Sequence, residues 1–172
     1  MENNSDLRLL KVTGLTYNPL NPGIYGLILK EVNGDRRLPI IVGENEAHSI
    51  EYKLQEIITA RPLTHDLMVN VMRALGLQLT RVVIKRLEGG VYAADLYLAS
   101  GGRELVIDAR SSDAIAIALR TGSPIYTSDA LLDDAGMKRS INVKVTKVEE
   151  IKPAPARVDA KPKELALSLI HI

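Results

Sequence analysis

Residues 77–109 read LQLTRVVIKRLEGGVYAADLYLASGGRELVIDA, and the class of the fold follows from this segment. It contains runs at 77–87, 91–99 and 103–109 that are rich in the β-branched and aromatic residues typical of strands. Paired glycines separate the runs, and such pairs mark tight turns. The segment therefore predicts a meander of three strands.

The sequence before the meander predicts further strands. Residues 7–14 are expected to form the first of them, and residues 24–32 and 37–42 the next two. The run NGD at 33–35 lies between the last two, and it is a strong signal for a β-hairpin turn. A hairpin is therefore expected upstream of the meander.

Apolar residues also recur at helical spacing. On this pattern, helices are expected at 44–58, 64–75, 114–121 and 128–135, and a short strand at 124–126. Thr64 is the expected N-cap of the second helix, and the run 110–113 opens the third, whose residues are apolar on every side. The sequence thus predicts an α+β fold, with a mixed or antiparallel sheet of hairpin and meander packed with about four helices.

The chain has 172 residues, which suggests one domain, expected at 1–150. Residues 151–172 are rich in Pro, Ala and Lys, and we expect a disordered linker and tail there. The final LALSLIHI is read as the start of a lost second module or as a scar, and it is excluded from the fold.

Composition excludes several functions. The chain has no Cys, so thiolate metal sites and Cys nucleophiles are ruled out, and six Tyr are its only aromatic residues, which argues against a base-stacking platform. Residues 1–136 hold 14 basic and 17 acidic side chains, a net charge of −3 that offers nucleic acid no general attraction. No membrane-length apolar run or signal peptide is visible, so a cytoplasmic protein without a membrane partner is expected.

The first segment with candidate chemistry lies at the start of the helix expected at 44–58. Glu44, His48 and Glu51 stand at helical positions i, i+4 and i+7, so they share one face and could hold a divalent metal. The alternative is a solvated helix face whose acidic residues favour the helix N-terminus.

The second segment, 61–66, places four polar types at one helix start. Arg61 and Thr64 could bind a phosphate there, His65 could move a proton near neutral pH, and Asp66 adds a carboxylate. The alternative is a capped helix start, in which Thr64 caps, Asp66 meets the helix dipole and His65 is exposed.

The third segment, 108–113, joins a strand to a helix. Asp108 and Asp113 could share a metal that activates water, and Arg110 could neutralise a phosphate. The alternative is an Asp108–Arg110 ion pair with a cap from Ser111 or Ser112. Arg120 could be the structural partner of an acidic residue.

Read in order, these segments resemble the bifunctional nuclease domain family of bacteria and plants. The resemblance rests on RLPIIVG at 37–43, RPLTHDL at 61–67, IDARSSDAIA at 107–116 and PIY at 124–126, and covers about residues 6–135. It implies a compact α+β domain, a homo-oligomer (most simply a dimer), and activity on both DNA and RNA. Similar bacterial proteins carry a C-terminal UVR motif, which is missing or truncated here.

The positions that match the motifs of the family are Glu46, Arg61, Thr64, His65, Asp66, Asp108, Arg110, Ser112, Asp113 and Arg120. His48 stands where relatives often differ, which weakens the metal site proposed for the first segment.

The resulting hypothesis is a nuclease of low sequence specificity, assisted by a divalent metal such as Mg²⁺ or Mn²⁺. Its catalytic residues are expected to be His65, Asp66, Asp108 and Asp113, and its metal ligands Asp108, Asp113 and Glu46. Its phosphate-binding residues are expected to be Arg61, Arg110, Thr64 and Ser112. The rival hypothesis is a non-catalytic homo-oligomeric scaffold or regulatory binding module, whose polar motifs are caps and ion pairs.

Overall fold

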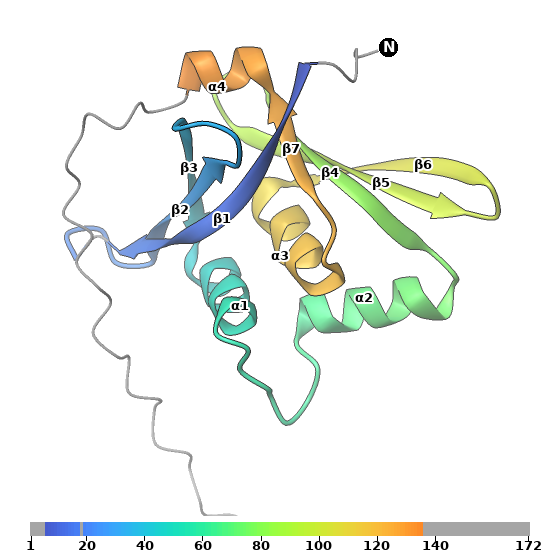
Figure 1. Cartoon of the computed structure of the whole chain (residues 1–172). Helices are drawn as coiled ribbons and strands as arrows, with labels where there is room; N and C mark the ends of the chain where they lie inside the picture. The colour runs from blue at the N-terminus through green and yellow to red at the C-terminus, as the bar shows by residue number, and fades with distance from the viewer. Residues whose placement is uncertain (1–5, 18, 136–172) are drawn as a thin grey trace, which may run out of the picture.

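A computed structural model describes residues 6–17 and 19–135 of the chain (Figure 1). Its sheet has seven strands in the order β3-β2-β1-β7-β4-β5-β6. The strands are β1 (Leu7–Tyr17), β2 (Ile24–Glu31), β3 (Arg37–Gly43), β4 (Gln78–Arg86), β5 (Tyr92–Ser100), β6 (Arg103–Arg110) and β7 (Ile125–Ser128). The helices are α1 (Glu44–Leu54), α2 (Thr64–Ala74), α3 (Ser111–Thr121) and α4 (Asp129–Ala135). The α+β class is therefore confirmed, whereas the expected linker and tail at 151–172 lie outside the described residues.

The hairpin and the meander both form, and β7 joins them into one sheet. This strand pairs antiparallel with β1, where Leu10 faces Ile125, and parallel with β4, where Val82 faces the same Ile125. All other neighbouring strands pair antiparallel. The sequence leaves a mixed and an antiparallel sheet open; the sheet is mixed, because one short strand returns to its centre.

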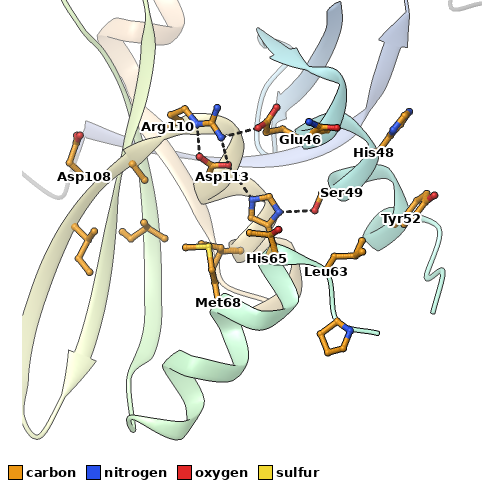
Figure 2. Close-up of a pocket in the computed structure, with 17 residues that line it drawn as sticks. Glu46, His48, Ser49, Tyr52, Leu63, His65, Met68, Asp108, Arg110 and Asp113 are labelled. Atoms are coloured by element: carbon orange, nitrogen blue, oxygen red, sulfur yellow. Dashed lines mark hydrogen bonds and ion pairs between the residues drawn. The ribbon is translucent and has the colours of Figure 1, made fainter. Parts of the chain in front are cut away.

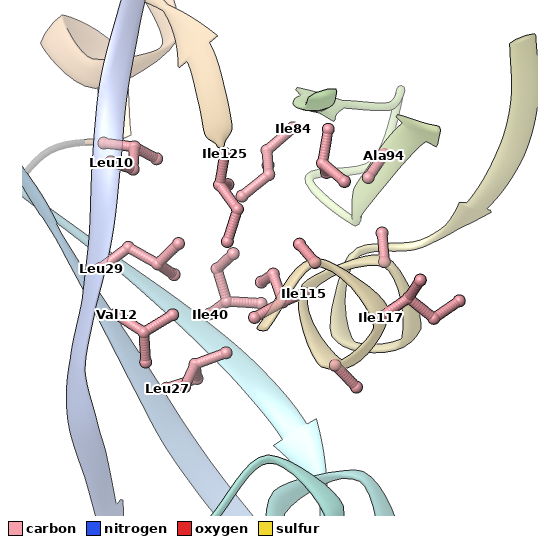
Figure 3. Close-up of a cluster of buried hydrophobic side chains, with 14 of the residues drawn as sticks. Leu10, Val12, Leu27, Leu29, Ile40, Ile84, Ala94, Ile115, Ile117 and Ile125 are labelled. Carbon is pink, nitrogen blue, oxygen red and sulfur yellow. The ribbon is translucent and has the colours of Figure 1, made fainter. Parts of the chain in front are cut away.

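The core lies between the sheet and α3. Figure 3 shows Ile115 of α3 on the side of Leu29 and Ile40 of the strands, and Ile117 on the other side of the helix; all four are fully or almost fully buried. The helix was expected to be buried because it is apolar on every side, and this is confirmed. It ends at Gly122, whose φ of 70° is a left-handed conformation that glycine adopts without strain.

The helix boundaries differ from the sequence prediction by one to four residues, most at the end of α1 and at the start of α3, which begins at Ser111 rather than at 114. Helix α1 ends at Leu54 rather than at 58, because Glu56 takes a positive φ of 55° and Ile57 donates its N–H back to the carbonyl of Tyr52. Helix α2 has Leu63 as its N-cap residue rather than Thr64. The Asp66 carboxylate does the capping instead, by accepting the Leu63 N–H at 2.9 Å.

Strand β6 forms one edge of the sheet and is exposed on both faces over most of its length. In Figure 1 the β5–β6 hairpin reaches away from the body of the molecule, and α2 runs below it. Within the described residues, no helix is long and apolar enough to cross a membrane.

Candidate active site

The candidate active site is an open cleft of about 940 Å³ between α1, the start of α2 and the β6–α3 junction. Polar side chains from all three segments line it, among them Glu46, Ser49, His65, Arg110 and Asp113. Residues almost 70 positions apart in the sequence therefore meet in one cleft. All three segments singled out from the sequence contribute to it: the first through Glu46 and His48, the second through His65, and the third through Arg110 and Asp113.

His65 lies at the centre of a chain of hydrogen bonds in this cleft (Figure 2). Its Nδ1 is 2.8 Å from the Ser49 hydroxyl on α1, and its Nε2 is 3.1 Å from Oδ1 of Asp113 on α3. Ser49 and His65 are both only 7% exposed. The imidazole is therefore held from both sides, and its expected exposure at a capped helix start is wrong.

The partners of these groups indicate one direction for each hydrogen bond. Arg120 Nη2 lies 3.1 Å from the Ser49 hydroxyl, and because a guanidinium can only donate, the Ser49 oxygen accepts that bond. The Asp113 carboxylate accepts from Nε2–H of His65, and in the tautomer with its proton on Nε2 the Nδ1 atom accepts from the Ser49 hydroxyl. This tautomer is assigned from the hydrogen-bond partners.

Arg110 places a positive charge at the mouth of the cleft. Its Nε and Nη2 donate to both oxygens of Asp113 at 2.6 and 3.0 Å, and Nη2 also donates to Glu46 at 2.8 Å. The side chain is nevertheless 67% exposed. Burial raises the pKa of the Asp113 carboxyl, but the hydrogen bonds from Arg110 and His65 outweigh it, so that pKa lies below its usual range.

Asp108 does not join this cluster. Figure 2 shows Asp108 apart from Arg110, Asp113 and His65. It lies on β6 opposite Asp95, and its carboxylate pairs with Lys85 of β4 at 3.0 Å. The alternative Asp108–Arg110 ion pair is also wrong, because Arg110 pairs with Asp113 and Glu46. No side-chain cap from Ser111 or Ser112 forms at the start of α3.

These contacts bear on the expected metal site. Glu46 and Asp113 face the same cation, Arg110, and Asp108 faces Lys85. Within 6–17 and 19–135, no three His, Asp or Glu side chains are grouped as metal ligands. The donor set therefore does not fit a ready-made divalent-metal site. Metal dependence stays a prediction.

Asp66 supports the helices rather than lining the cleft. Beside the Leu63 N–H, its carboxylate accepts a hydrogen bond from Arg120 Nε at 2.6 Å. Burial raises the pKa of Asp66, but the bonds from Arg120 and Leu63 N–H outweigh it and leave that pKa lowered. The expectation that Arg120 is the structural partner of an acidic residue is confirmed.

The remaining expected site residues are spread more widely. Thr64 lines the cleft, whereas exposed Arg61 and buried Ser112 do not. In the first segment, the ring of His48 packs edge-on against Tyr25, 5.9 Å between centroids, and Glu51 accepts a hydrogen bond from Gln55. Glu44, His48 and Glu51 therefore have no common ligand geometry.

Ser49 is the site residue that sequence reasoning missed. It lies between Ala47 and Ile50, on the buried side of α1. A hydroxyl on the apolar stripe of a helix needs a buried partner, and this was the available signal. The sequence alone could not name His65 as that partner.

Comparison with known proteins gives a family. The profile described as bifunctional nuclease domain matches residues 27–140. An uncharacterized protein of Mycobacterium tuberculosis (strain CDC 1551 / Oshkosh) is 46% identical over 111 residues, which are 64% of this chain and 66% of the relative. Bifunctional nuclease 1 of Oryza sativa subsp. indica is 30% identical over 118 residues, 66% of this chain but 36% of the rice protein. The chain thus spans slightly less than two thirds of the mycobacterial relative and about a third of the rice protein. Since the profile covers well over half of its length, the chain belongs to the bifunctional nuclease domain family.

Proposed function

We propose that the protein is a nuclease that hydrolyses phosphodiester bonds in DNA and RNA at this cleft. The observation that carries the proposal is His65, which is bonded to the Asp113 carboxylate and to a hydroxyl within a cleft that also presents Arg110. An imidazole oriented by a carboxylate is a common proton-transfer group. Membership of the family and the name of the rice relatives support the same activity.

In this proposal, Arg110 binds the scissile phosphate. A guanidinium can contact two phosphate oxygens at once, and two thirds of this side chain is open to solvent. Asp113 orients His65, which transfers the proton. Contacts to phosphate carry no information about base sequence, and aromatic side chains for base stacking are few, so low sequence specificity is expected.

The proposal is tested with the full chain, purified over two orthogonal columns and incubated with single-stranded RNA and with plasmid DNA. We expect cleavage of both by the wild type and a loss of roughly 10²–10⁴-fold in His65→Gln. His48→Gln is the matched control, since His48 lines the same cleft but contacts Tyr25 rather than the hydrogen-bonded chain. Equal cleavage by the wild type and a folded His65→Gln variant means a contaminant and overturns the proposal.

Reactions with Mg²⁺, with Mn²⁺ and with EDTA test metal assistance, which we retain as a proposal because metals commonly activate water for this chemistry. Asp108→Asn tests the predicted metal ligand that lies apart from His65, Arg110 and Asp113. If the activity is metal-dependent and Asp108 is a ligand, this variant needs more metal for half-maximal activity. Full activity in EDTA contradicts metal assistance.

We also propose that the chain forms a homo-oligomer, most simply a dimer. Large apolar side chains remain exposed on α2 (Leu67, Val71), at Leu75 directly after it, and on β6 (Leu105, Ile107), each 44–67% exposed. Large exposed apolar side chains that gather on one surface are typical of an interface. This is also the observation that favours the rival scaffold function, in which self-association occurs without catalysis.

Light scattering after size exclusion tests the association. Leu67→Glu together with Leu75→Glu is expected to give a monomer, because two charges would be buried in the interface. Ile41→Glu, at an apolar position of β3 that is even more exposed, is the control and should leave the mass unchanged. A monomeric wild type at micromolar concentration contradicts this proposal.

A further inference from the structure

Both ring nitrogens of His65 already have hydrogen-bond partners. These partners limit the groups from which the imidazole can take a proton. Nε2 carries the proton that is donated to Asp113, so only the Nδ1 lone pair can accept another proton. That lone pair faces the Ser49 hydroxyl at 2.8 Å. A water molecule could reach it only by displacing Ser49. The proton that His65 is placed to accept is therefore the proton of Ser49.

A nucleophilic hydroxyl needs a positive charge beside its oxygen as well as a base for its proton, and Arg120 supplies that charge. Its Nη2 donates to Ser49 Oγ at 3.1 Å, and the side chain is only 6% exposed. Asp66 and the Ala116 carbonyl hold the guanidinium in this position. A fixed cation beside a hydroxyl oxygen stabilises the negative charge that develops when the proton leaves, more strongly in a dry site than in water.

We propose that Ser49 is a nucleophile toward phosphorus esters, activated by His65 and Asp113 in the manner of a serine–histidine–aspartate triad. Ser49 Oγ forms a bond to phosphorus while the bond from phosphorus to the leaving oxygen breaks. The Ser49 proton passes to His65 Nδ1 and then to that leaving oxygen. Water next attacks the phosphorus of the phosphoseryl ester and gives its proton to His65, while the bond from phosphorus to Ser49 Oγ breaks and His65 returns a proton to that oxygen.

The substrate of this reaction rests on the proposed nuclease function, but the nucleophilic reactivity of Ser49 does not. Ser49 lines the cleft but is only 7% exposed, so its reactivity is probed with a small phosphorus electrophile, which needs no nucleic acid. Because the chain has no Cys, thiols cannot compete for such a reagent. Nucleophilic reactivity can therefore be measured separately from cleavage of DNA or RNA.

The experiment treats the full chain with diisopropyl fluorophosphate, which loses fluoride when a serine oxygen attacks its phosphorus. We expect one adduct, mapped to Ser49 by peptide mass spectrometry, and no adduct at this position in Ser49→Ala. His65→Gln and Asp113→Asn should slow labelling by roughly 10²–10⁴-fold. Ser123→Ala is the matched control, because the Ser123 hydroxyl is also part-buried and bonded twice but lies outside the cleft.

Nuclease assays on the same variants, with melting temperatures recorded, separate the two ideas. Loss of cleavage in a folded Ser49→Ala variant, together with labelling of wild-type Ser49, supports both. An unlabelled Ser49 combined with full cleavage by Ser49→Ala overturns the nucleophile while the proposed nuclease stands. A labelled Ser49 in a preparation that cleaves neither DNA nor RNA supports the nucleophile and overturns the nuclease.

Discussion

At the scale of single residues, Asp66 has a structural role, whereas its partner Arg120 contacts the site directly. The two side chains form an ion pair beside the cleft, and Arg120 also reaches the Ser49 hydroxyl. Asp66 itself faces Leu63 N–H and the guanidinium rather than the cleft lining. Asp66 therefore acts on the site only through the group it holds.

We expect Asp66→Asn to lower the free energy of unfolding by about 1–3 kcal/mol, because it leaves a buried guanidinium without its charged partner. Urea unfolding measures this loss. Below the unfolding transition, cleavage activity should fall much less than in His65→Gln. Asp35→Asn is the control, because Asp35 is highly exposed and its ion pair with Lys30 is long, at 3.9 Å. A stable but inactive Asp66→Asn variant restores the catalytic role predicted from the sequence.

The same scale shows how far a sequence can define a site. His65, Arg110 and Asp113 were identified because polar residues cluster at helix starts. Ser49 was not, because it meets His65 only where α1 and α2 both pack against α3. Asp108 was grouped with Asp113 by proximity in the chain, but strand pairing directs it to Lys85 instead.

At the scale of elements, the turn from β2 to β3 is more than a connection. Buried Glu31 accepts two hydrogen bonds from Arg36, and its carboxylate lies directly over Gly34. A Cβ at Gly34 would lie 2.1 Å from Oε2 of Glu31 and 2.5 Å from Cδ. The turn therefore needs glycine for space, because Glu31 is held in place and cannot move aside.

Gly34→Ala is expected to lower the free energy of unfolding by about 1–3 kcal/mol, the usual effect of overpacking. A double-mutant cycle in urea checks the cause. In a Glu31→Ala background, the same Gly34→Ala change should have almost no effect, because the clashing carboxylate is gone. An equal loss in both backgrounds would show that backbone preference, not Glu31, requires the glycine.

Elements were easier to predict than their assembly. The hairpin turn and the paired glycines are local signals, and both gave the expected strands. The apolar pattern at Ile57 and Ile58 suggested a longer α1, but both side chains are exposed after the helix ends. The insertion of β7 between β1 and β4 has no local signal, because parallel pairing joins segments about 40 residues apart.

At the scale of the whole molecule, one ion-pair network ties the start of the chain to α4. Arg36 pairs with Glu31, Asp129 and Asp133, and Arg8 of β1 also pairs with Asp129. Hydrogen bonds from Arg8 and Arg36 lower the pKa of Asp129 to about 2. The pKa values of Glu31, Asp66 and Asp113 are also lowered.

These shifts predict a loss of stability in acid. Each lowered carboxyl pKa means that the unfolded chain binds the proton more readily, so the stabilisation is fully present above about pH 4 and is lost as pH falls toward 2. Urea midpoints measured from pH 6 to pH 2 should therefore decrease steadily. Arg36→Gln should flatten this dependence, because it removes the partner of several carboxylates. An unchanged slope in that variant would falsify the role of the network.

The central position of β7 has a consequence for synthesis. A ribosome makes the hairpin and the meander first, and the four residues of β7 that join them come near the end of the described chain. Until then, β1 and β4 each present an open main-chain edge, the kind of edge that pairs with other chains. Residues 125–128 therefore cover both open edges when they pair with β1 and β4. We expect a chain that stops before them to aggregate through the unpaired edges of its two half-sheets.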